Sequence, residues 1–155
     1  MTGDVTSALF AFLHHVAAFA LVAALTAELV LIRSPLTVEN ARRILRFDAA
    51  YGMSATLLLV AGFLRVFYFE KGASYYFHSA PFLAKLALFA AIGLLSAWPT
   101  FEFLSWRNAL RQDRLPAINP GKLVRIRSII HWELVLLVPL LLAAALMARG
   151  VGNFA

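Results

Sequence analysis

Apolar residues along this chain fall into four long runs that are separated by short polar connections. Each run exceeds the ~20 residues that an α-helix needs to cross ~30 Å of hydrocarbon, and the runs cover residues 8–32, 47–69, 80–104 and 126–148. Because the connections are short, we expect neighbouring helices to run antiparallel and to pack as one bundle. The pattern therefore predicts an all-α integral membrane protein, a four-helix bundle in which residues 1–155 form one transmembrane domain.

The composition favours a membrane protein over a soluble one. The chain is 62% hydrophobic and 14% charged, whereas about a quarter of the residues in soluble proteins are charged. A soluble domain of this size could not bury so much apolar surface. The first apolar run lacks a basic leader and a small-residue cleavage site, so we expect it to be retained rather than removed as a signal peptide. The absence of cysteine excludes disulfides, thiolate catalysis and cysteine-ligated metal clusters.

The distribution of basic residues predicts the orientation in the membrane. Ten of the fourteen basic residues flank the first and third connections, namely Arg33, Arg42, Arg43, Arg46, Arg107, Arg111, Arg114, Lys122, Arg125 and Arg127. The positive-inside rule places these connections in the cytoplasm and both termini outside, in a bacterial inner (plasma) membrane. The basic residues that give the chain its net charge of +6 then determine its topology, and they also attract anionic lipid to some extent. Nucleic acid is not an expected partner.

Two proline-containing segments predict local features of the bundle. The stretch "SPLTVENARRILRF" predicts a turn at Pro35, followed by a short amphipathic segment at the cytoplasmic interface. Pro99 lies within the third apolar run, and we expect it to kink the inner end of that helix.

Ionisable residues within the runs form two sets at different depths. The outer set comes from three helices and contains His14, His15, Arg65 and Lys85, with His78 in the adjacent connection. The inner set contains Glu28, Asp48, Glu102, His131 and Glu133. A charged side chain at the centre of a membrane helix costs about 2.5–3.5 kcal/mol on insertion scales, so such residues usually have partners or a function. For the inner set we predict ion pairs with the basic flanks.

The outer set is the candidate functional site. Adjacent helical positions diverge by about 100°, so one pocket can take only one of His14 and His15. His14 shares a helix face with Glu28 and is expected to face the bundle. A histidine with two cations below the membrane surface suits an apolar ligand that carries anionic groups. Haem b fits, because imidazole binds the iron and Arg65 and Lys85 can pair with the propionates.

An iron-free porphyrin fits this set of residues equally well. Phenylalanines from three helices are expected to line the pocket, namely Phe12, Phe19, Phe63, Phe67, Phe82 and Phe89. A site for a metal ion alone is disfavoured, because neither an H-x-x-x-H pair nor an H-E-x-x-H motif is present.

Three short motifs give the chain a family resemblance. These are "LH" early in the first helix, "FLAKLAL" opening the third and "WEL" early in the fourth. In these positions the chain resembles the HemJ-type membrane protoporphyrinogen oxidases, and more closely a group of small four-helix bacterial membrane proteins without an assigned function. The resemblance implies a haem b ligated by His14 or His15, with Lys85 as a catalytic residue and Glu133 at an acidic position. The chain has "LSAW" and "AEL" where that family has a tyrosine-histidine pair and "LPR".

The sequence thus predicts a haem-b-binding, redox-active membrane protein, with a porphyrinogen or a quinone-type molecule as partner if it is an oxidoreductase. One alternative is a non-catalytic membrane subunit or scaffold, in which Arg65 and Lys85 extend to the interface and the histidines serve packing. Another is a small proton-coupled transporter. Small residues spaced along the first helix permit a homo-oligomer but serve the intrachain bundle equally well.

Overall fold

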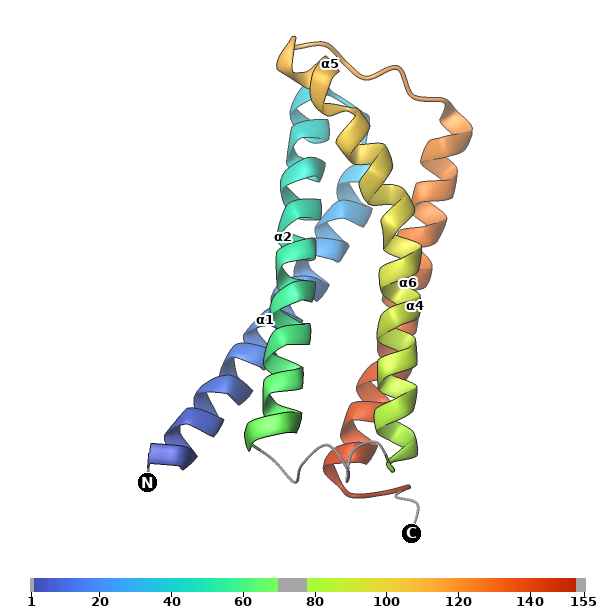
Figure 1. Cartoon of the computed structure of the whole chain (residues 1–155). Coiled ribbons are helices and arrows are strands. Elements are labelled where there is room, and N and C mark those ends of the chain that lie inside the picture. The colour runs from blue at the N-terminus through green and yellow to red at the C-terminus, as the bar shows by residue number, and fades with distance from the viewer. Residues whose placement is uncertain (1, 70–77, 153–155) are drawn as a thin grey trace.

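The computed structural model describes residues 2–69 and 78–152. Four long helices run up and down in chain order, namely α1 (Thr2–Arg33), α2 (Val38–Leu64), α4 (Ala80–Ser105) and α6 (Pro120–Ala148). The π-helical turn η1 (Arg65–Phe69) continues α2, and the short helix α5 (Arg107–Arg111) follows α4. All four long helices are long and apolar enough to cross a membrane. The prediction of an all-α, four-helix membrane bundle is confirmed (Figure 1).

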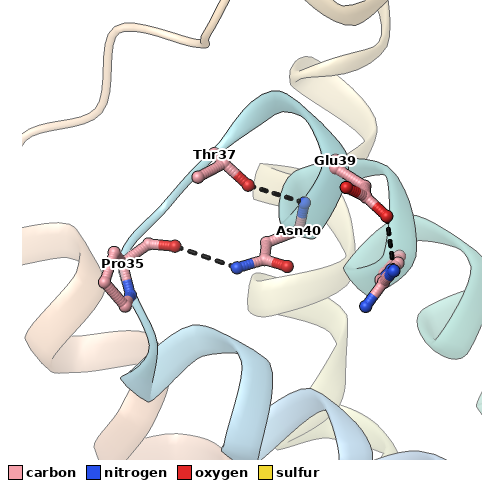
Figure 2. Close-up of polar contacts among 5 residues, drawn as sticks. Pro35, Thr37, Glu39 and Asn40 are labelled. Carbon is pink, nitrogen blue, oxygen red and sulfur yellow. Dashed lines mark hydrogen bonds and ion pairs between the residues drawn. The ribbon is translucent and has the colours of Figure 1, made fainter.

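Helix α2 begins at Val38, well before the apolar run starts, so no separate interfacial segment follows Pro35. The side chain of Thr37 caps the helix by accepting a hydrogen bond from the backbone N–H of Asn40 at 3.1 Å. The Asn40 amide in turn donates to the Pro35 carbonyl at 3.0 Å, and Glu39 pairs with Arg43 one turn later (Figure 2). The expectation of a separate amphipathic segment was wrong because this cap starts the helix immediately after the turn.

Helix α6 also begins earlier than its apolar run indicates. The side chain of Asn119 accepts a hydrogen bond from the backbone N–H of Gly121 at 2.8 Å. Pro120 occupies the first helical position, where a missing N–H leaves no bond unmade. The basic residues from Lys122 to Arg127 therefore lie on the helix itself and not in the preceding connection.

The helices pack closely at the end of the bundle that carries the basic connections, which we call the basic end. Helix α1 packs along α2 and also against α6, and α4 packs along α6. The buried core at this end includes Leu25, Ile32, Ile44, Phe103, Trp106, Ile126 and Ile130. At the opposite end the buried apolar cluster is small, consisting of Val66 and Phe82 with Met147 packed against them. Towards that end α1 leans away from α4 and α6 (Figure 1).

Each of the two long helices in the second half of the chain, α4 and α6, contains a proline. Pro99 is buried within α4 and Pro139 lies within α6. Beyond its middle, α4 changes direction towards α2 as it approaches α5 (Figure 1). This bend is consistent with the kink expected at Pro99, because a proline ring displaces the preceding helical turn.

The orientation in the membrane stays a prediction, which cysteine labelling tests directly. The chain contains no cysteine, so His78→Cys and Ala117→Cys each introduce a single exposed thiol at opposite ends of the bundle. If the basic end faces the cytoplasm, a membrane-impermeant maleimide added to intact cells labels the His78→Cys variant. The Ala117→Cys variant reacts only after permeabilisation. The reverse pattern would place both termini in the cytoplasm.

Candidate functional site

A cavity lies at the loosely packed end of the bundle, and we call it the histidine pocket. Its cavity volume is about 100 Å³ and it is open on one side; small-molecule sites typically hold ~300–1,000 Å³, so a larger ligand would extend out through the open side. Residues from α1, α2, η1, α4 and α6 line it, namely His14, Leu58, Leu59, Gly62, Phe63, Arg65, Val66, Phe82, Lys85, Leu86, Phe89 and Met147. The pocket thus contains three of the four ionisable residues of the predicted site.

His14 faces this pocket and lies directly against the backbone of α2. Its ring is half-buried, and its Nδ1 atom is buried without a hydrogen-bond partner in the described part of the chain. A Cβ atom placed on Gly62 would lie 3.4 Å from the Cε1 atom of His14 and 3.7 Å from its Nδ1 atom. Any longer side chain at position 62 would therefore displace the imidazole. The sequence does not show that Gly62 lies against His14, because a glycine in an apolar helix carries no sign of what packs against it.

His15 points away from the pocket. Its side chain is exposed, and its Nδ1 atom lies 2.6 Å from the carbonyl oxygen of Ala11 one turn earlier. The two histidine rings make an edge-to-face contact with their centroids 6.1 Å apart. The structure therefore selects His14, as the angular argument predicted, and does not bring His15 to the site.

Arg65 and Lys85 reach the histidine pocket from different elements. Arg65 begins the π-helical turn η1, and its backbone N–H donates to the carbonyls of both Ala61 and Gly62. Lys85 lies in the second turn of α4. These two cations are the charged groups that act most strongly on His14. Single π-helical turns within α-helices are frequent at functional sites, and no sequence pattern predicted this one.

The phenylalanines divide evenly between the pocket and the outer surface. Phe63, Phe82 and Phe89 line the pocket, as expected. The other three of the predicted set do not line it, because their side chains are exposed on the outside of the bundle; they are Phe12, Phe19 and Phe67. Helical periodicity explains the difference for Phe12, which is two positions from His14 and so lies about 200° away from it on α1.

Three acidic side chains are buried together between the middle of the bundle and its basic end. Glu28, Asp48 and Glu133 are 2%, 7% and 1% exposed, and each lies within electrostatic range of another member of the group. The hydroxyl of Thr100 donates to the Oδ1 atom of Asp48 at 2.7 Å. One carboxylate oxygen of Glu28 and both oxygens of Glu133 are buried without a hydrogen bond of good geometry among the described residues, although Ser96 on α4 lies close enough to act on the Glu133 carboxylate.

For Glu28 and Glu133 the prediction of ion pairs with the basic flanks was wrong; Asp48 also makes no ion pair within the described residues, although Arg107 acts on it electrostatically. One basic residue of the flanks, Arg127, instead donates from Nε to the carbonyl of Ile32 at 2.9 Å. The acids instead face one another across α1, α2 and α6, which keeps them out of the hydrocarbon. Within the described residues no group of three or more histidine, cysteine or acidic side chains could hold a metal ion.

The remaining members of the inner set lie nearer the surface. Glu102 pairs with Lys122, with 2.9 Å between Oε2 and Nζ, so the predicted ion pair is confirmed at this position. His131 is exposed and contacts the ring of Trp132 at a centroid distance of 6.3 Å. It lies away from both the acids and the histidine pocket.

Four apolar helices around buried polar groups define this chain as a multi-pass α-helical membrane protein. The family model described as "Predicted membrane protein (DUF2214)" matches residues 6–152, so the chain belongs to that family. No curated protein matches the chain. No solved structure matches it either. The resemblance to the HemJ-type oxidases is not shown by these comparisons.

Replacing a buried acid by its amide tests the acidic group. We expect Glu133→Gln to raise the free energy of unfolding by about 1 kcal/mol at pH 7, because glutamine keeps the shape of the side chain and carries no charge to bury. The wild-type side chain must either bury a charge beside Glu28 or take up a proton. Thermal unfolding of the purified protein in detergent measures the difference.

Glu102→Gln is the matched control, since it removes one carboxylate from the same half of the bundle. It breaks the partly exposed pair with Lys122 and should lower stability by about 0.5 kcal/mol. A loss of stability in Glu133→Gln larger than in Glu102→Gln would mean that a charged Glu133 is held by a favourable interaction.

Proposed function

We propose that the histidine pocket binds a porphyrin, with haem b as the preferred ligand. The observation that carries the proposal is the convergence of His14, Arg65 and Lys85, from three separate elements, on one cavity whose other lining residues are apolar. Such a cavity suits a ligand with a large apolar body and two anionic groups. A porphyrin with two propionates has this chemistry.

The residues present fit haem in three respects. His14 lines the pocket, and a neutral imidazole is a common axial ligand of haem iron. Arg65 and Lys85 offer cationic hydrogen-bond donors for carboxylates. Three aromatic rings and several aliphatic side chains supply an apolar lining for the macrocycle, with Phe63, Phe82 and Phe89 as the rings.

A haem bound here would supply one-electron redox chemistry, which makes the protein a candidate redox component of the membrane. The chain's own residues would bind and orient the ligand and exclude water from it. Lys85 is the candidate catalytic residue, because it is the amine that lies beside His14 in the pocket. Oxidation of a porphyrinogen is the narrower form of the proposal and is supported only by the HemJ-type resemblance. A non-catalytic subunit is the alternative if the pocket binds no pigment.

The two adjacent histidines provide a matched test of haem binding. The full chain, purified from cells supplied with haem, should show a Soret band with stoichiometric haem. His14→Ala should lose most of this band because it removes the only histidine in the pocket lining. His15→Ala should keep the band, since His15 faces away. Equal retention in both variants, or a colourless wild-type protein at full haem supply, would contradict the proposal.

A second test fills the pocket without changing any ionisable residue. Leucine at Gly62 would occupy the space next to His14, and overpacking of this kind costs about 1–3 kcal/mol, so ligand affinity should fall by about tenfold or more. Gly93→Leu is the control, because no atom lies within 4 Å of a Cβ at that exposed position. Titration of haem into the apo-protein measures both affinities. An unchanged affinity in Gly62→Leu would move the ligand away from His14.

A further inference from the structure

A second cavity lies at the basic end, and its lining is dominated by arginine. Arg42 and Arg46 on α2 and Arg107 and Arg111 on α5 surround it, together with Leu45 and Leu110. Each pair of arginines is four positions apart and therefore lies on one face of its helix. The cavity, which we call the arginine cleft, has a volume of about 400 Å³ and is open to its surroundings.

The chain only partly neutralises these four charges. Arg42 donates to the carbonyl of Leu110 at 2.8 Å and pairs with Asp113 at 2.9 Å. Within residues 2–69 and 78–152, Arg46, Arg107 and Arg111 have no ion pair. Asp48 acts on Arg107 electrostatically, but it is buried and accepts the hydrogen bond from Thr100. The cleft therefore has a strong positive charge.

Membrane topology alone does not explain this arrangement. The positive-inside rule requires basic residues near a connection, but it does not require them to face the same hollow. Other basic residues of this end make separate contacts. Arg43 pairs with Glu39, Lys122 pairs with Glu102, and Arg125 lies over the ring of Trp98 at 4.9 Å. Like charges four positions apart on a helix repel each other, so the cleft is a destabilising arrangement that a bound anion would offset.

We propose that the arginine cleft binds the phosphate groups of an anionic phospholipid. Guanidinium groups form paired hydrogen bonds with phosphate oxygens, and basic pockets at the ends of membrane helices bind anionic lipid headgroups. The cleft lies near the beginning of α2 and at the end of the α4–α5 span, where the headgroup region is expected. The cleft lining also includes Leu45 and Leu110, whose apolar side chains can contact acyl chains.

The number of arginines indicates which headgroups should bind best. Two pairs of guanidinium groups can engage two phosphates, so a diphosphatidylglycerol lipid should bind more tightly than a lipid with one phosphate. A soluble diphosphate shares this chemistry and is the other source of the same anion. The proposal concerns the opposite end of the bundle from the histidine pocket and does not depend on haem.

Native mass spectrometry of the purified full chain in neutral detergent tests the lipid site. Tetraoleoyl diphosphatidylglycerol should be retained and dioleoyl phosphatidylcholine should not. The double variant Arg46→Gln/Arg107→Gln should bind the anionic lipid about tenfold more weakly or worse, because each basic residue near a headgroup contributes to the attraction. The double variant Arg43→Gln/Arg114→Gln removes the same charge outside the cleft and should stay within about twofold of wild type.

Inorganic pyrophosphate, added to the protein without anionic lipid, distinguishes the two sources of phosphate. If pyrophosphate binds weakly and displaces the lipid only at high concentration, the cleft is a lipid site. Tight binding to wild type, lost in the cleft variant, supports a phosphate site and assigns it to a soluble diphosphate. Equal weakening of lipid binding in both double variants would overturn the proposal, because the attraction would then be a diffuse effect of net charge. Equal retention of phosphatidylcholine would also overturn it.

Discussion

The packing of α1 against both α2 and α6 at the basic end holds the two helical hairpins together. Apolar side chains gain little by leaving lipid for a protein interior, so close packing and polar contacts decide how membrane helices associate. Here the buried core, with Leu25 of α1 and Ile130 of α6 among its fully buried members, lies towards one end. The opposite end is left more open, and the histidine pocket occupies this space. The position of the candidate site follows from where the bundle is packed.

Polar groups in the bundle are placed according to the cost of exposing them to hydrocarbon. The outer set surrounds a cavity, whereas the inner acids bury themselves against one another. Glu28 and Glu133 have buried oxygens without a hydrogen bond of good geometry in the described chain, while His14 has a buried nitrogen without one. The difference is that His14 lines a cavity together with the two cations Arg65 and Lys85. This is why the histidine, and not the acidic group, forms the centre of the proposed function.

The two proposed sites have related chemistry at opposite ends of the molecule. Each combines cationic side chains with apolar surface, and each suits an amphiphile that carries anionic groups. They differ in how the cations are held. Arg65 and Lys85 lie at the edge of an apolar cavity, whereas the arginine cleft is lined mainly by exposed guanidinium groups. The first arrangement favours a ligand with a large apolar body, and the second favours a headgroup at the membrane surface.

The sequence by itself determined the four spans, because apolar runs of that length have few alternatives to crossing a bilayer. It also indicated that His14 and not His15 faces inward, since neighbours on a helix diverge by about 100° and His14 shares its face with Glu28. Only the tertiary structure decided that Gly62 lies against His14, that Glu28 faces other acids, and that α2 and α5 together form the arginine cleft. The physical reason is that helical periodicity sets the direction of a side chain on its own helix. Which residue of a neighbouring helix that side chain contacts depends on the distance, tilt and bends of the helices, and these arise from packing over the whole bundle.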